Sequence, residues 1–380
     1  MAEILEITTL ADLQPYQLAW KSLWEQTPGA TFFHTYDWFV TFWKHFGQKR
    51  TMRILILRSG GKTVGILPLC IVGEQHRLAR LRVLTYPLND WGMWYGPLGP
   101  NPSATLFMAM RYLHDAQRDW DVLDLRWSSG GVDDRNATGR AMWAIGWRAQ
   151  QSVYQQSSLI RFADSTWEEF SHQLSKKWRH EIRRQTRNLA ELGPVEFVRH
   201  RPQAATAGDG DPRYDLFDEC VEVSRGTWQA SVTDGNTLCH ESVLPFLRES
   251  HSVASRLGMV DLALLRVAGR AVAFQYNYHS HGELFGLRMG YLQEMRDWGV
   301  GKVLLAQFLE DSFDRQDLQM DLGIGEYDFK SRFRTGTLAS YRYTYSPWNC
   351  WRWQSVQLAQ WFKKRLVRSP QIEPSKPTIA

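Results

Sequence analysis

The stretch from residue 283 to residue 310 constrains the fold of this chain more than any other. It begins with the extended apolar run ELFGLRMGY, passes through MRDWGVGK at 295–302 and continues into the strongly apolar run VLLAQFLE. The first run favours a strand, and the last favours a helix that packs on a sheet. Because glycine allows tight turns and close backbone approach, the two glycines between these runs indicate a strand-to-helix turn that is open to a ligand.

This turn has the properties of a phosphate site. The start of a helix presents unpaired amide groups and the positive end of the helix dipole, and both suit a pyrophosphate. Gly299 and Gly301 let the backbone approach phosphate oxygens, while Arg296 and Lys302 add positive charge. The sequence therefore predicts a phosphate cradle between residues 296 and 302, and a plain strand-to-helix turn is the alternative.

Length and composition favour a globular protein with two lobes. The chain has 380 residues, more than one ordinary domain needs, and 43% of them are hydrophobic. The formal net charge is only +5, and both signs are spread along the chain, which argues against DNA as a partner. The four cysteines are far apart in the sequence, so no metal or redox motif is expected.

The sequence also bears on location. The start, MAEILEITTLADLQ, lacks the basic end and apolar run of a signal peptide, and no stretch approaches the roughly 20 apolar residues of a membrane span. We expect a cytoplasmic protein without a transmembrane segment. Weak contact with a membrane surface is one expectation for a final helix over 351–368, where aromatic residues adjoin a basic run; docking of that helix on the protein is the alternative.

Strand and helix signals come in two similar sets, which predicts an α/β chain with mixed sheets and two lobes of duplicated fold. We expect the first lobe over 1–163, the second over 164–350 and a C-terminal helix and tail over 351–380. Expected strands lie at 4–8, 52–58, 63–72, 81–85, 121–127, 158–162, 259–268, 271–280, 283–291, 318–324 and 341–347. The principal expected helices lie at 175–192, 216–228, 243–257 and 299–315.

Several of these segments resemble one family. Arg-x-x-Gly-x-Gly between a strand and a helix resembles the coenzyme A pyrophosphate motif of the GNAT acetyltransferases. The wider stretch from Tyr291 through VGKVLL to DLGIGEYDFKSRF is similar to the BioF2-like/CelD branch, as are SKKWRHEIRRQTR, FFHTYDWFVTFW and GILPL. This branch is related to the FemAB peptidoglycan ligases, which have two GNAT-like lobes in tandem. Its members often carry Pro-Gly where this chain has Val300-Gly301, but Gly301 still lets the backbone approach the phosphate oxygens closely.

The resemblance implies an acyl-CoA co-substrate and a place for it. Backbone amides near Met289 and Tyr291 would hold the thioester oxygen. The segment from Arg296 through Gly299, Val300, Gly301 and Lys302 would hold the pyrophosphate. The strand at 318–324 would diverge from its neighbour and leave a slot for the acyl arm.

Four residues are candidates for catalysis. Asp321 and Glu326 are possible general bases, Tyr327 a possible acid for the departing thiolate, and Lys330 a possible holder of the oxyanion or of an anionic acceptor group. Each has a structural alternative. Asp321 would otherwise bind a loop amide or an arginine, Glu326 would be an exposed loop acid, Tyr327 a core or surface side chain, and Lys330 a solvated lysine.

The basic helix at 175–192 is the second candidate feature. Arg179, Arg183 and Arg184 are candidates for binding an anionic acceptor or the phosphates, and a solvated helix face is the alternative.

The leading hypothesis is an acyl-CoA-dependent N- or O-acyltransferase. It would act on an amino or hydroxyl group of a cell-envelope or exopolysaccharide precursor, a small-molecule or saccharide acceptor. The alternatives are a FemAB-like transferase with an aminoacyl-tRNA donor and a non-catalytic protein of binding or assembly.

Overall fold

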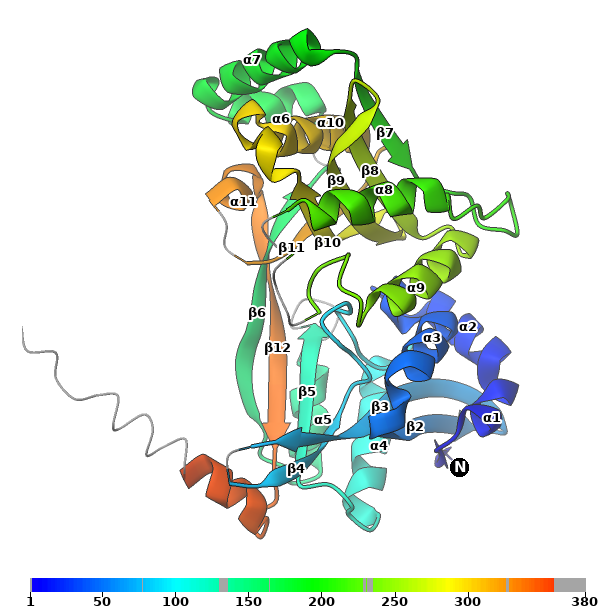
Figure 1. Cartoon of the computed structure of the whole chain (residues 1–380). Coiled ribbons are helices and arrows are strands. Elements are labelled where there is room, and N and C mark those ends of the chain that lie inside the picture. Colours follow the sequence, from blue (N-terminus) through cyan, green and yellow to red (C-terminus); the bar gives the residue numbers. More distant parts are fainter. Residues whose placement is uncertain are drawn as a thin grey trace, which may run out of the picture.

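The strands of the protein join into one continuous sheet. The computed structural model describes residues 2–76, 78–129, 136–163, 165–227, 230, 235–325 and 328–358. The sheet has 12 strands in the order β1-β2-β3-β4-β5-β12-β6-β11-β10-β9-β8-β7 (Figure 1). The strands are β1 Ala2–Ile7, β2 Arg50–Ser59, β3 Lys62–Gln75, β4 Arg80–Thr85, β5 Val122–Ser129, β6 Gln150–Arg161, β7 Val195–His200, β8 Val260–Val267, β9 Arg270–Ser280, β10 Glu283–Tyr291, β11 Gln319–Ile324 and β12 Gly336–Tyr345.

Helices cover both faces of this sheet. In the second lobe, α8 and α9 pack on one face, and α10 with α6 and α7 packs on the other (Figure 1). The helices are α1 Leu10–Leu13, α2 Gln17–Gln26, α3 Tyr36–Phe46, α4 Pro102–Asp115, α5 Ala137–Ala144, α6 Trp167–Gln173, α7 Lys176–Leu192, α8 Tyr214–Arg225, α9 Leu244–Arg256, α10 Val300–Asp314 and α11 Asp328–Phe333. A further helix begins at Trp351 and is described as far as Leu358.

The sheet contains the same arrangement twice. In the first half, β1, β2, β3 and β4 pair antiparallel in turn, and β4 then pairs parallel with β5. In the second half, β7, β8, β9 and β10 do the same, and β10 pairs parallel with β11. A helix links the parallel strands in both halves, α4 in one and α10 in the other. The duplication inferred from the two sets of sequence signals is therefore a duplication of topology.

The last strand of each half lies in the sheet of the other half. β6 pairs with β11, and β12 pairs with β5, while β6 and β12 pair with each other at the centre. This exchange was not predicted, because the alternation of side chains in a strand records which face is buried and not which strand lies alongside. It joins the lobes through backbone hydrogen bonds. The helices α3 and α9 also meet across the junction, where the rings of Phe46 and Phe246 are 4.9 Å apart.

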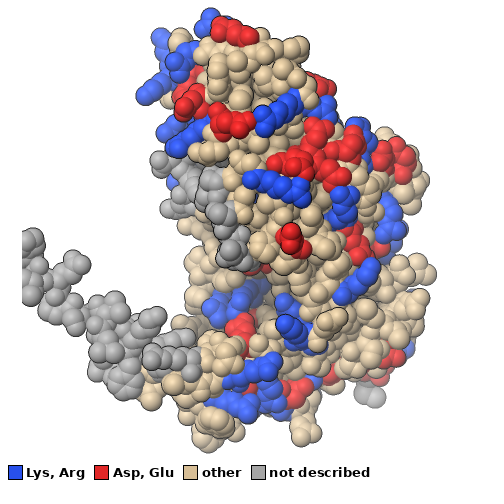
Figure 2. Space-filling model, in the orientation of Figure 1, with Lys and Arg blue, Asp and Glu red and all other residues tan. Residues whose placement is uncertain are grey.

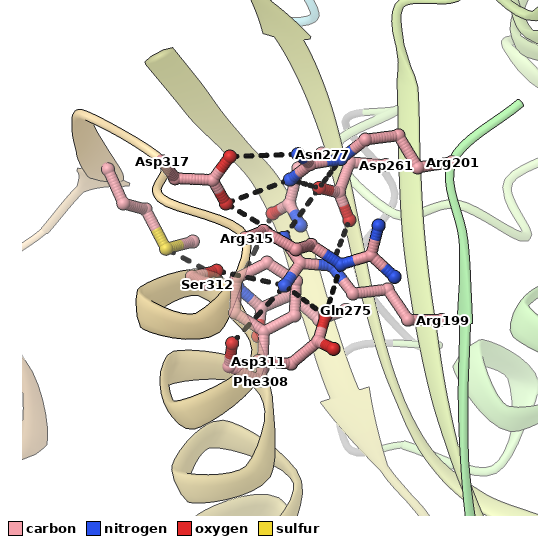
Figure 3. Close-up of polar contacts among 11 residues, drawn as sticks. Arg199, Arg201, Asp261, Gln275, Asn277, Phe308, Asp311, Ser312, Arg315 and Asp317 are labelled. Carbon is pink, nitrogen blue, oxygen red and sulfur yellow. Dashed lines mark hydrogen bonds and ion pairs between the residues drawn. The ribbon is translucent and has the colours of Figure 1, made fainter. Parts of the chain in front are cut away.

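A buried ion cluster fixes the end of α10 to the sheet (Figure 3). Arg199 on β7 donates to Asp261 on β8 at 2.7 Å and to Asp311 on α10 at 2.7 Å. Arg201 binds Asp261 and also Asp317, with 2.8 Å to the latter. Arg199 and Asp261 have side-chain exposures of 2% and 0%. Because buried charges are tolerated only when they are paired, each member of the cluster depends on the others.

Most expected elements agree with the structure to within a few residues, but β6 begins at Gln150 and not at 158, β12 begins at Gly336 and not at 341, and β7 was not among the expected strands. The helix expected at 175–192 is α7, which is capped by the Ser175 hydroxyl accepting from the Trp178 amide at 3.2 Å. Leu192 was assigned to its apolar face but is 42% exposed, because the helix ends there and Gly193 turns the chain away. The helix expected at 216–228 ends earlier, at Arg225. The final helix beyond Leu358 lies outside the described residues.

Candidate active site

Two parallel strands separate in the second lobe. β10 and β11 pair at Glu283, Leu284 and Phe285, and Phe285 opposite Asp321 is the last pair. β10 nevertheless continues to pair with β9 as far as Tyr291, across a bulge between Gly286 and Arg288. Beyond Phe285, the edge of β10 that faces β11 therefore has no strand partner among the described residues. This is the divergence that the sequence predicted, and it leaves backbone groups of β10 available to a ligand.

Two glycines permit this divergence. A Cβ atom on Gly286 would lie 2.9 Å from the carbonyl oxygen of Asp321. Gly323 has φ +75°, and a Cβ there would lie 2.7 Å from the carbonyl oxygen of Gly286. The two backbones thus touch where the strands part, and a larger residue at either position would push them apart.

The predicted phosphate cradle forms the start of α10. Gly299 caps the helix with φ +69° and ψ +25°, a left-handed conformation that favours glycine. Gly301 lies in the first turn, where an added Cβ would be 3.0 Å from the ring of Tyr291. Val300 between them is fully buried, and Arg296 just before them is exposed. The cradle residues of the sequence analysis therefore do lie together, directly after β10.

Helix α7 packs against this cradle. A Cβ on Gly299 would lie 2.2 Å from the side chain of Gln185, so glycine is what makes room for that amide. Lys302 donates to Glu181 at 2.6 Å, and this bond lowers the pKa of the Glu181 carboxyl. Gln185 is buried and donates to Glu181 at 3.2 Å, but its Oε1 atom has no hydrogen-bond partner among the described residues.

The same helix reaches α11. Trp178, near the start of α7, meets Phe333 at the end of α11 edge-to-face, with ring centres 5.0 Å apart. Helix α7 therefore contacts both α11, which follows β11, and the start of α10, which follows β10. It lies across the side of the site where the two strands diverge.

Asp321 occupies the point of divergence. Its carboxylate accepts from the indole N–H of Trp94 at 2.7 Å and from the Gly323 amide at 2.8 Å. The side chain is buried, with 3% exposure. Burial raises the pKa of this carboxyl, although the Trp94 and Gly323 hydrogen bonds and the charge of Lys330 act in the opposite direction. The loop amide expected as a structural partner is present, and a tryptophan from the other lobe is an additional one.

Lys330 is buried beside this carboxylate and is not the solvated lysine of the alternative interpretation. Its ammonium donates to the carbonyl oxygens of Gly323 at 2.9 Å and Ile324 at 2.8 Å. Burial lowers the pKa of Lys330 to about 8, against the opposing attraction of Asp321. The lysine thus holds the turn that follows β11. Glu326 and Tyr327 lie outside the described residues.

The first lobe contributes to the site through its loop between β4 and α4. Besides Trp94, this loop supplies Trp91, whose indole donates to the Gly235 carbonyl at 2.9 Å and lies 4.1 Å beneath the guanidinium of Arg288. Arg288 also donates to the Asn236 carbonyl at 2.6 Å. The sequence analysis missed these residues, because Trp94 and Asp321 are 227 positions apart. Their only local signal was the density of glycine, proline and tryptophan in the loop.

The three candidate arginines of α7 differ in their surroundings. Arg179 is partly buried and lies 3.0 Å from the ring nitrogen of His172 on α6. Arg183 and Arg184 are exposed. Figure 2 shows basic residues gathered at the upper left of the molecule, where Figure 1 places α7. Met289 and Tyr291 lie on the diverging part of β10, opposite Gln275 and Ala273 of β9.

Comparisons with known proteins agree with this geometry. Residues 176–331 match the family model described as "Acetyltransferase (GNAT) domain". The matched segment lies within the second lobe, which is thus similar to a GNAT-type acetyltransferase domain, and the fold as a whole consists of two GNAT-like lobes in tandem. The search of curated proteins finds no match.

Solved structures share the fold over nearly the whole chain. A structure described as FemX is 10% identical, with 94% of this chain and 99% of that chain covered and a TM-score of 0.60. The C-terminal domain of a putative lysylphosphatidylglycerol synthetase from Agrobacterium fabrum is 12% identical, with 91% and 97% covered and a TM-score of 0.53. L-PGS from Bacillus licheniformis is 14% identical, with 87% and 97% covered and a TM-score of 0.51.

Two further findings concern the described residues alone. No helix among them is long and apolar enough to cross a bilayer. No group of three or more His, Cys, Asp or Glu side chains among them is placed to hold a metal ion. The absence of a metal requirement remains a prediction.

Proposed function

We propose that the protein transfers an acyl group from acyl-CoA directly to an amino or hydroxyl group of a cell-envelope or exopolysaccharide precursor. The observation that carries this proposal is the separation of β10 from β11 directly at Asp321, next to the glycine-rich start of α10. The strand gap suits a thioester arm, and the helix start suits a pyrophosphate. The acceptor class rests on the resemblance to the CelD branch.

The chain's own groups have distinct tasks in this proposal. Exposed Arg296 and the amides after Gly299 bind the phosphates, and amides near Met289 and Tyr291 stabilise the oxyanion. The attacking group forms a bond to the thioester carbon, and the carbon–sulfur bond breaks. Asp321 accepts the proton that the attacking group loses, and Tyr327 donates one to the departing thiolate. A raised pKa suits Asp321 to this task, because a base works best when its pKa approaches the working pH.

An aminoacyl-tRNA donor is the second candidate, and the position of α7 favours it. Gln185 packs on Gly299, and Glu181 neutralises Lys302, so both reduce the room and the charge available to a pyrophosphate. Exposed Arg183 and Arg184 on the same helix would suit a phosphate backbone. The fold likeness to FemX is compatible with either donor.

The test is a screen of acyl-CoAs for thiol release against amino sugars and polysaccharide fragments, with thermal shifts for coenzyme A and for aminoacyl-tRNA. Gly301→Trp should abolish the coenzyme A shift and lower turnover at least 100-fold, because the indole would fill the first turn of α10 and displace Tyr291. Ala144→Trp, at an exposed position on α5 in the other lobe, is the matched control and should leave both unchanged.

Three outcomes separate the candidates. Unchanged turnover in folded Gly301→Trp would refute the donor site. A shift with aminoacyl-tRNA and none with any acyl-CoA would reverse the order of the two donors. No shift with either donor and no turnover would favour a non-catalytic role.

A further inference from the structure

Three aromatic side chains of the first lobe form a continuous series that ends at Asp321. Trp94 donates to the Asp321 carboxylate at 2.7 Å and meets Trp127 edge-to-face, with ring centres 5.8 Å apart. Trp127 in turn meets Tyr154 at 5.6 Å and an interplanar angle of 81°. Trp94 and Tyr154 are partly exposed, whereas Trp127 between them is 9% exposed. An aromatic wall defined by Trp94, Trp127 and Tyr154 thus adjoins the candidate base.

The backbone is strained to hold this wall in place. Trp94 has φ +50° and Trp127 has φ +62°, left-handed values that bulky residues rarely adopt. The two positions are tied together, because the amide of Tyr95 donates to the Trp127 carbonyl at 3.1 Å. Strain of this kind costs on the order of 1–3 kcal/mol per residue and persists where surrounding contacts enforce it, commonly at ligand sites. Two strained tryptophans at the junction of the lobes are therefore consistent with a ligand site.

The wall reaches Asp321 from the side of the first lobe. Asp321 is the last residue of β11 that pairs with β10, so the opening between these strands is on its second-lobe side. The aromatic wall approaches the same carboxylate from the first lobe, through the β4–α4 loop and the strands β5 and β6.

We propose that Trp94, Trp127 and Tyr154 bind the ring of an amino sugar and present its amino group to Asp321. This inference rests on the proposed function and specifies its acceptor. The C–H face of a pyranose is apolar and flat, and it packs on indole and phenol rings. The amino group, when protonated, is attracted both by aromatic faces and by a carboxylate.

Binding and turnover are measured separately. Saturation-transfer NMR and calorimetry on the full chain use glucosamine as the probe, with glucose lacking the amine and cyclohexylamine lacking the sugar. We expect glucosamine to bind tightest. Trp94→Leu and Tyr154→Leu should each weaken glucosamine binding at least tenfold, and Trp94→Phe should weaken it less because an aromatic face remains. The Tyr154 variant leaves the Trp94–Asp321 bond in place, so it tests the wall independently of the base.

Trp143→Leu is the control, because Trp143 is 74% exposed on α5 and lies outside the wall. It should bind glucosamine like the native chain, and the coenzyme A thermal shift should be equal in all four variants. Unchanged glucosamine affinity in folded Trp94→Leu and Tyr154→Leu would overturn the inference, as would equal binding of cyclohexylamine. Neither result would contradict the proposed acyltransferase function. That function would be refuted if no acyl-CoA released thiol with any acceptor.

Discussion

At the scale of single residues, the decisive group is Asp321. Its carboxylate is buried and accepts hydrogen bonds from Trp94 of the first lobe and from the Gly323 amide of the second. Lys330 supplies the nearby positive charge, and its ammonium donates hydrogen bonds to the turn carbonyls of Gly323 and Ile324. A carboxylate kept buried without a bidentate arginine retains lone pairs for a substrate proton, unlike the fully paired Asp261.

The Asp321→Asn variant should fold and bind its donor but lose turnover by about 10²–10⁴-fold, the range that a general base contributes. The amide keeps an acceptor and the volume of the side chain. In the native protein, kcat/KM should fall as pH decreases through the pKa of Asp321, and this acid limb should lie above the usual range of an aspartate because burial raises that pKa. The residual kcat/KM of the variant should not show this fall at acid pH.

Asp314→Asn, an exposed carboxylate at the end of α10, is the control and should keep native rates. Native turnover in Asp321→Asn would remove Asp321 from the mechanism and leave the base to be sought elsewhere.

Local sequence patterns identified some of these residues and not others. Gly299 and Gly301 were identifiable because a strand, two glycines and an apolar helix occupy consecutive positions. The burial of Lys330 was not, since a lysine six residues after Ile324 looks the same in sequence whether it is solvated or enclosed. Trp94 was missed for a stronger reason: its partner is on the other lobe, and nothing local specifies that contact.

At the scale of elements, α10 is fixed at both ends by charged contacts. Its start is held by Lys302 bound to Glu181, and its end by Asp311 bound to Arg199. Burial alone would raise the pKa of Asp261, but Arg199 and Arg201 lower it to about 2. A carboxyl whose folded pKa lies below its unfolded value of about 3.9 stabilises the fold above that pH. That stabilisation is lost as the pH falls from about 4 to 2.

Arg199→Met should therefore destabilise the protein by about 3–5 kcal/mol, because it leaves buried carboxylates without a partner. It should also move the midpoint of acid unfolding to higher pH. Both quantities are measured by denaturant and pH titrations followed by circular dichroism. Arg270→Met is the control: its ion pair with Glu294 has exposures of 66% and 60%, and such pairs contribute little. Equal effects of the two variants would contradict the structural role of the cluster.

At the scale of the whole molecule, the exchange of β6 and β12 makes the two lobes one sheet. The sequence predicted two lobes and most of their strands, and the order of elements within each lobe followed from that. Which lobe receives each final strand depends on tertiary contacts that alternation patterns do not encode. The proposed boundaries at 163 and 350 thus divide the sequence, whereas the sheet crosses them.

Ser340→Pro should test this coupling. Ser340 is in the central strand β12 and faces Ser129 of β5 and Gln155 of β6, so proline there disrupts two ladders. Hydrogen exchange should show lost protection in β5 and β6 together, although β5 lies in the sheet of the first lobe and β6 in the sheet of the second. Glu3→Pro, in the edge strand β1, should affect β1 and β2 alone. Loss of protection confined to one lobe in Ser340→Pro would show that the lobes unfold independently.

The exchanged strands also determine when the sheet can be completed during synthesis on the ribosome. A ribosome releases the chain from its N-terminus, so residues 1–163 emerge long before β12 at Gly336–Tyr345 exists. Until then, the nascent first lobe has an open edge on β5 and a strand, β6, whose partners β11 and β12 are still unmade. Open strand edges promote aggregation, and early domains ordinarily close before later ones appear. Here the first lobe completes its sheet only when translation is nearly finished.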